Sequence, residues 1–96
     1  MDPVVSELDV ESLVIAWAED HGWLCAKLQW IGQTGWPDRT FIKNGKVVFV
    51  EFKRPKGGVR APKQLHWHRQ LRKHGATAVF ISTVEEGIEL LKTFDD

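Results

Sequence analysis

Two carboxylates and a lysine could form a small chemical site at one end of a predicted β-hairpin. The dipeptide Asn44-Gly45 favours a two-residue hairpin turn between two apolar strands. The register set by that turn places Asp38 directly opposite Glu51, and Lys53 follows two residues later on the same face. Opposed carboxylates repel each other, so a shared proton or a bound divalent cation must stabilise the pair.

A divalent cation would give this group a specific chemistry. Magnesium usually takes one or two carboxylates from a protein, and the bound ion polarises a phosphoryl oxygen and lowers the pKa of a water ligand. Lys53 would then stabilise the hydroxide or the charge that develops on the phosphate, and the Phe52 carbonyl could supply a further oxygen ligand. These are the groups needed to hydrolyse a phosphodiester.

Two simpler interpretations of the same residues stay open at this point. A three-residue turn would shift the register and place the two acids on opposite faces of the sheet. A salt bridge between Glu51 and Lys53 would also neutralise one carboxylate. Neither arrangement requires a cation.

Charge is strongly segregated along a chain whose net charge is zero. Residues 1–22 contain six acidic residues and no Lys or Arg, and residues 85–96 contain five acidic residues and one Lys. Residues 23–84 contain 12 Lys and Arg, and their only acidic residues are Asp38 and Glu51. A basic middle segment favours binding to a phosphate backbone, although acidic terminal helices could simply be solvated faces that balance the charge.

The rest of the sequence predicts the elements that position these residues. Helices are predicted from Ser6 to about His21, from Pro62 to just before Gly75, and from Thr83 onward; strands are predicted over 23–29, 38–43, 46–53 and 78–82. The apolar face of the first helix is predicted to consist of Leu8, Leu13, Val14, Ile15, Trp17 and Ala18. The order α-β-β-β-α-β-α predicts an α/β fold, a mixed sheet with helices on both faces.

Length and composition exclude several classes of protein. The 96 residues are enough for a single domain, 1–96. The one cysteine, Cys25, excludes an internal disulfide framework and a Cys-rich zinc site, and His66 and His68 lie on different faces of their predicted helix. The glycines at 57–58 lack the spacing of a phosphate-binding P-loop, so no nucleotide cofactor is expected. No signal peptide or membrane span is expected either.

The site residues also resemble a known pattern. Pro37-Asp38 followed by Glu51-Phe52-Lys53 resembles the PD…(D/E)xK signature of restriction-endonuclease-like nucleases. The wider pattern resembles the VRR-Nuc family (virus-type replication-repair nuclease), and it consists of Glu11, Lys27, Gly35 to Arg39, Val48 to Lys53 and Gln64. The likeness runs from about Glu7 to Leu91, nearly the whole chain.

The resemblance implies a restriction-endonuclease-like core and a role for each matched residue. It implies a Mg²⁺ or Mn²⁺ site made by Asp38, Glu51, the Phe52 carbonyl and Glu11, the last directly or through water. Lys53 takes the role of the catalytic lysine, and Gln64 occupies a helix position that faces the site. Read without the resemblance, Glu11 would be a solvated acid at the helix edge and Gln64 a satisfied polar group near the core.

The resemblance also implies a substrate and an assembly. Stand-alone members resemble phage-encoded homodimers that act on branched DNA, including four-way junctions. We therefore expect a metal-dependent DNA endonuclease that works as a homodimer in the cytoplasm of a phage-infected or bacterial cell. The alternatives are a nuclease without preference for branched DNA and a catalytically silent DNA-binding module.

Seven residues are expected to contact the DNA. They are Lys27, Trp36, Arg39, Arg54, Lys56, Arg60 and Lys63. The basic residues of the loop that follows the hairpin could grip phosphates or belong to a solvated turn. Trp36 could stack on a base or wedge a branch point, although packing in a core or an interface is the commoner role of tryptophan.

Overall fold

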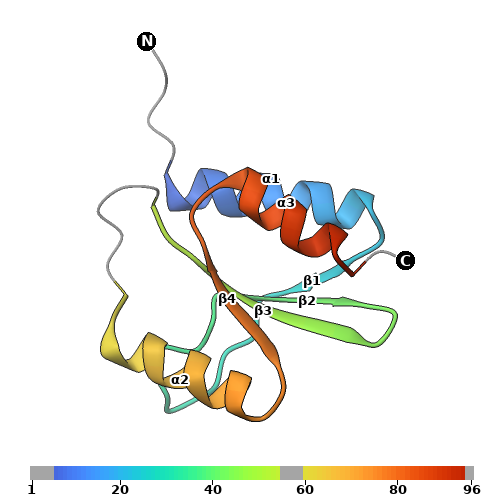
Figure 1. The fold of residues 1–96 in the computed structure, drawn as a ribbon. Helices are drawn as coiled ribbons and strands as arrows, with labels where there is room; N and C mark the ends of the chain where they lie inside the picture. Colours follow the sequence, from blue (N-terminus) through green and yellow to red (C-terminus); the bar gives the residue numbers. More distant parts are fainter. Residues whose placement is uncertain (1–5, 55–59, 95–96) are drawn as a thin grey trace.

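The computed structural model describes residues 6–54 and 60–94 (Figure 1). The elements are α1 (Glu7–Asp20), β1 (Leu24–Ala26), β2 (Arg39–Lys43), β3 (Lys46–Phe52), α2 (Pro62–Lys73), β4 (Thr77–Ile81) and α3 (Val84–Lys92). The predicted α/β class and the predicted order α-β-β-β-α-β-α are both confirmed. Within the described ranges, no helix is both long enough and apolar enough to cross a bilayer.

The sheet is mixed and has the spatial order β1-β2-β3-β4. β1, β2 and β3 are antiparallel neighbours, whereas β4 runs parallel to β3. Lys43 pairs with Lys46 across the turn, where Asn44 and Gly45 both have positive φ angles of 51° and 79°. The predicted hairpin register is therefore correct, and the alternative three-residue turn is excluded.

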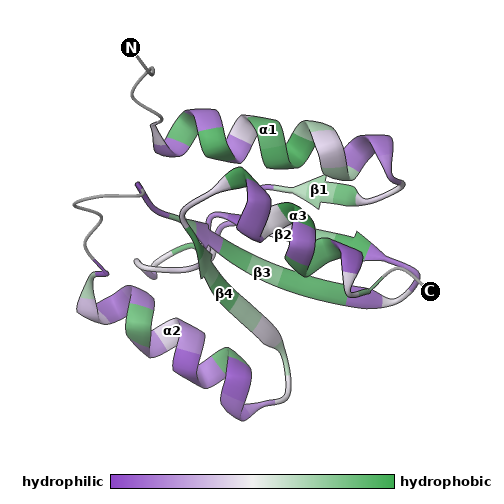
Figure 2. Cartoon of the chain, turned by 45° about the horizontal axis from the view of Figure 1, so that its top comes forward, coloured by the Kyte–Doolittle hydropathy of each residue, from purple (hydrophilic) through white to green (hydrophobic). Residues whose placement is uncertain are grey.

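Helices cover both faces of the sheet, with α1 and α3 on one side and α2 on the other (Figure 1). The α1/α3 side holds most of the core, which includes Val10, Val14, Ala18, Phe41, Val48, Val50, Phe52, Ile81 and Leu91. α1 and α3 approach so closely at Gly87 that a Cβ there would lie 2.7 Å from a methyl group of Val14. The α2 side is less apolar, and α2 itself is mostly hydrophilic (Figure 2).

Two details of the predicted elements are wrong. The buried face of α1 is Val10, Val14 and Ala18, whereas Leu8 and Leu13 expose 74% and 55% of their surfaces. The first strand is only three residues long and not the predicted seven. It starts one residue late, because the Trp23 N–H donates to the Ala18 carbonyl (2.9 Å) and so closes the end of α1, and it ends three residues before the predicted end.

One polar side chain lies fully inside the α2 side of the molecule. His68 is completely buried, and its ring stacks on Phe80 with the centroids 4.0 Å apart. Burial lowers the pKa of the His68 imidazole to about 4, and the positive charges of Arg72 and Arg60 act in the same direction. His68 is therefore neutral in the folded protein at neutral pH.

This burial predicts a specific loss of stability in acid. Between the ordinary His pKa of 6.5 and about 4, the unfolded chain binds a proton at His68 that the folded chain does not. The free energy of unfolding therefore falls as the pH falls through this range, by about 3 kcal/mol in total. Denaturant unfolding at a series of pH values should show a shallower decline for His68→Phe, and equal slopes for the two proteins would contradict the assignment.

Candidate functional site

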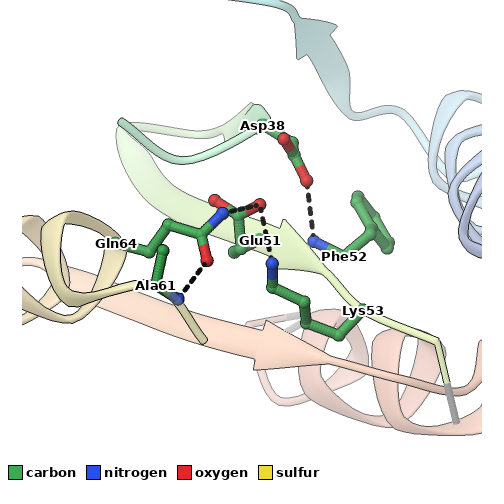
Figure 3. A network of polar contacts seen from close by, with 6 residues as sticks. All are labelled: Asp38, Glu51, Phe52, Lys53, Ala61 and Gln64. Carbon is green, nitrogen blue, oxygen red and sulfur yellow. Dashed lines mark hydrogen bonds and ion pairs between the residues drawn. The ribbon is translucent and has the colours of Figure 1, made fainter. Parts of the chain in front are cut away.

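Asp38 ties the open end of the hairpin together. The β2–β3 ladder ends at the Arg39–Val50 pair, so Asp38 lies one residue before β2 and is not part of a ladder pair with Glu51 as the register had implied. Its Oδ2 instead accepts a hydrogen bond from the Phe52 backbone N–H, with N and O 2.9 Å apart (Figure 3). The Asp38 carboxylate is thereby held beside the end of β3.

Glu51 is the buried carboxyl of the site. It lies in β3 between β2 and β4, and only 3% of its surface is exposed. Its Oε2 accepts a hydrogen bond from Gln64 Nε2 (3.2 Å) and lies 4.0 Å from Lys53 Nζ (Figure 3). Its Oε1 is buried and has no hydrogen-bond partner in the described part of the chain. The described residues give the Glu51 carboxyl one further contact, with the Asp38 side chain, and a hydrogen bond between the two adds to burial in raising the pKa of Glu51.

The surroundings of Glu51 favour its neutral form. Burial raises the pKa of the Glu51 carboxyl from 4.5 to about 9, and the neighbouring Asp38 carboxylate adds to the rise. The positive charge of Lys53 opposes this rise. Either a proton or a divalent cation could relieve the repulsion between Asp38 and Glu51. When no cation is bound, a proton on Glu51 relieves it.

Gln64 reaches Glu51 because of the way in which α2 begins. The residue before the helix, Ala61, has no side chain that can cap it. Gln64 supplies part of the cap, since its Oε1 accepts a hydrogen bond from the Ala61 N–H (3.0 Å). This bond orients the amide so that its Nε2 faces Glu51, as Figure 3 shows. The expectation that Gln64 faces the site agrees with this geometry.

The loop before Asp38 is clamped onto the first turns of α2. Gly35 has φ +86°, and a Cβ there would lie 2.6 Å from the Lys63 carbonyl carbon and 2.8 Å from the Gln64 nitrogen. The Trp67 indole N–H also donates to the Thr34 carbonyl (2.9 Å). The loop that carries Asp38 and the helix that carries Gln64 are therefore positioned against each other.

Glu11 does not join the two carboxylates in a cluster. Its Oε2 lies 2.6 Å from Arg39 Nε, and both side chains are partly buried. Among residues 6–54 and 60–94, no group of three or more His, Cys, Asp or Glu side chains could hold a metal ion. A second acid on α1, Glu7, is close enough for its charge to contribute to the raised pKa of Glu51. Its place one helical turn before Glu11 is a signal that the sequence interpretation missed.

The donor set that remains fits a cation that needs few protein ligands. Asp38 and Glu51 offer carboxylate oxygens, one of which is the unpartnered Oε1 of Glu51. Mg²⁺ typically binds through one or two carboxylates and retains several waters, and Mn²⁺ accepts the same oxygen ligands. The expected contributions of the Phe52 carbonyl and of Glu11 stay predictions.

The residues expected to contact DNA fall into three groups. Lys27 and Trp36 line a cleft that reaches Asp38. Arg39 is paired with Glu11 and so is already engaged within the protein. Arg54, Arg60 and Lys63 are exposed on either side of residues 55–59, and Lys56 lies outside the described residues. Arg60 also packs over Phe80, with its guanidinium carbon 4.5 Å from the ring centroid.

Comparison with known proteins adds to this geometry. No protein-family model matches the chain. A UPF0102 protein of Roseobacter denitrificans is 32% identical over 88 residues, which are 92% of this chain and 68% of that protein. A solved VRR_NUC domain is 28% identical with a TM-score of 0.83, covering 92% of this chain and 96% of its own.

A second solved structure supports the fold alone. It is a VRR_NUC domain protein with 17% identity and a TM-score of 0.80, and the match covers 96% of this chain and 89% of that one. The nuclease-like fold expected from the residue pattern is therefore confirmed.

The contact between Gly35 and α2 can be tested with a matched pair of variants. Gly35→Ala adds a Cβ that clashes with backbone atoms of residues 63 and 64, whereas Gly32→Ala meets nothing within 4 Å. Both glycines have nearly the same positive φ, +86° and +87°, so both variants carry the same backbone strain of about 1–2 kcal/mol. Thermal and denaturant unfolding should show that Gly35→Ala loses about 1–3 kcal/mol more. Equal losses would contradict the clamp.

Burial of Glu51 predicts that removing its charge stabilises the fold. Because its pKa is raised from 4.5 to about 9, the folded protein holds a proton that the unfolded chain releases above pH 4.5. Stability contributed by Glu51 is therefore complete below pH 4.5 and is lost as the pH rises toward 9. Glu51→Gln should raise the free energy of unfolding at pH 8 by roughly 1–3 kcal/mol and much less at pH 4.5. Denaturant titrations at both pH values test this, and a destabilised variant at pH 8 would contradict it.

Proposed function

The chain belongs to the UPF0102 family and has the nuclease-like VRR_NUC fold, and from this premise we propose that it is a metal-dependent endonuclease that hydrolyses DNA phosphodiesters. The observation that carries the proposal is the meeting of Asp38, buried Glu51 and Lys53 at one end of the sheet. These residue types supply cation ligands and a positive charge at the place where a phosphate would react.

Each site residue has a distinct role in the proposed mechanism. Asp38 and Glu51 would hold the cation, and Mg²⁺ or Mn²⁺ bound there would supply positive charge toward a phosphoryl oxygen. Lys53, whose side chain is mostly buried, stabilises the attacking water or the negative charge that grows on the phosphate. Gln64 orients Glu51 through its amide N–H. Water attacks the phosphorus in line with one ester oxygen, so that a new P–O bond forms and the bond to that ester oxygen breaks. The water loses a proton to solvent, and the leaving oxygen takes up a proton to become a hydroxyl group.

The DNA is bound by the basic middle segment of the chain. Exposed Lys27, Arg54, Arg60 and Lys63 are suited to contact backbone phosphates. Branched DNA such as a four-way junction is the proposed preferred substrate, and a homodimer is the proposed assembly. The two proposals belong together, because a two-fold dimer would supply two related sites for the two symmetric cuts that a four-way junction requires.

The role of Lys53 gives the sharpest test of the proposed function. In Mg²⁺ or Mn²⁺, the wild-type protein should nick DNA in a panel of four-way, flap, splayed and linear substrates, and chelator should abolish the nicks. Lys53→Ala should cut at least about 100-fold more slowly because the developing charge loses its stabilising group. Its affinity for the four-way junction, measured by gel shift, should stay within a few-fold of the wild type.

The control for this test is a lysine far from the site. Lys92→Ala removes an exposed lysine of α3 that pairs with nearby Glu89, and it should cut at the wild-type rate. Normal cutting by Lys53→Ala would contradict the mechanism. A shift of labelled DNA without nicks in either cation would support the silent DNA-binding module in place of an enzyme.

A further inference from the structure

A cleft adjoins the proposed active site and shares one of its residues. Its volume is about 570 Å³, and it is lined by residues 27–30 and 33–38, from Lys27 to Asp38. This volume lies within the range of about 300–1,000 Å³ that is typical of small-molecule sites. Because Asp38 belongs to both the cleft and the acidic pair, a group bound in the cleft lies next to the proposed cation site.

The most accessible aromatic surface in the cleft is Trp30. It exposes 47% of its surface, while its ring contacts Trp36 and Trp67 with centroids 5.3 Å and 4.9 Å away. Trp36 is less exposed, since it packs between Phe49 (5.7 Å) and Trp67 (5.8 Å). Trp30 therefore presents an exposed indole that is held in place by contacts with two other rings, one of which is Trp36.

The polar groups around Trp30 indicate what the cleft can bind. Gln29, Gln33 and Thr34 are exposed in the same loop and can donate to or accept from the edge of a heterocycle. Lys27 supplies a positive charge, and the Trp67 bond to the Thr34 carbonyl keeps the loop against α2. An aromatic face, amide groups and a cation in one cleft match the three parts of a nucleotide: base face, base edge and phosphate.

We propose that this cleft binds one unpaired nucleobase of the DNA beside the phosphodiester that is cut, an inference that rests on the proposed function. The base stacks on Trp30, its edge meets the amide and hydroxyl groups of the loop, and its phosphate lies toward Lys27. The next phosphate then reaches Asp38 and Glu51. This site gives a reason to select DNA with unpaired nucleotides, because a base inside a duplex cannot enter the cleft.

The test measures DNA binding in chelator, so that it does not depend on cleavage. Two fluorescein-labelled duplexes carry one unpaired nucleotide, which has an intact base in one and an abasic sugar in the other. The wild type should bind the intact form about tenfold more tightly, which is the usual gain from stacking one base on an aromatic side chain. Trp30→Ala should bring this ratio close to one, and Trp30→Phe should restore most of it.

The control is an apolar side chain far from the cleft. Leu13 exposes 55% of its surface on α1, which lies on the other side of the sheet from α2 (Figure 1), so Leu13→Ala should keep the wild-type ratio. Thermal unfolding of each variant shows that the comparison is made between folded proteins, and Trp30→Leu, which keeps apolar bulk but has no ring, serves where Trp30→Ala does not fold. A wild-type ratio near one, or a tenfold ratio that persists in the folded Trp30 variant that lacks the ring, would overturn the proposal. Failure of the nuclease function would appear separately, as DNA left uncut in Mg²⁺ or Mn²⁺.

Discussion

Burial of one carboxyl beside another is the constraint around which this end of the sheet is arranged. Glu51 lies on a strand with a neighbour on each side, where a lone carboxylate would be strongly destabilising. Its neighbours reduce that penalty in different ways. The Gln64 amide donates a hydrogen bond to Glu51, and the Lys53 ammonium lies 4.0 Å from it. The Phe52 N–H in turn holds the Asp38 carboxylate beside the end of β3. These groups come from the loop before β2, the end of β3 and the start of α2, so the site forms only when all three parts are in place.

The start of α2 shows how far this dependence extends. Ala61 cannot cap the helix, and the side chain that does so, Gln64, is also the hydrogen-bond donor to Glu51. A loop glycine, Gly35, approaches the same turn so closely that no side chain fits between them. The cap of α2, the packing of the Gly35 loop and the orientation of Glu51 therefore depend on one another. A change in any of them disturbs the others, because the Gln64 amide bonds both Ala61 and Glu51.

Local signals predicted the fold well, and contacts between distant residues explain what they missed. The turn at 44–45 fixes the hairpin register by backbone geometry alone, so the register and the meeting of Asp38 with the end of β3 were readable. The salt bridge between Glu11 and Arg39 joins residues 28 positions apart, so no local sequence pattern predicts it. The spacing of apolar residues in α1 was compatible with more than one buried face. In the folded protein Val10 is buried and Leu8 is exposed, because the packing of α1 on the sheet determines which face is covered. The sequence suggested a DNA contact for Trp36, but only three-dimensional packing distinguishes the half-buried Trp36 from the exposed Trp30.

The distribution of charge shows that Asp38 and Glu51 would repel a DNA phosphate unless their negative charge were neutralised. Asp38 and Glu51 are the only acidic residues between positions 23 and 84, a segment with 12 basic residues. The basic residues attract a phosphate backbone, but a phosphate that arrives at the acidic pair meets charge of its own sign. Protonation of Glu51 weakens that repulsion without providing any catalytic group. In the proposed function, a divalent cation would instead reverse the sign of the local charge and use the same oxygens as ligands. The proposed role as cation ligands accounts for two acids at this position, since uncharged side chains would have accepted the phosphate more readily and stabilised the fold.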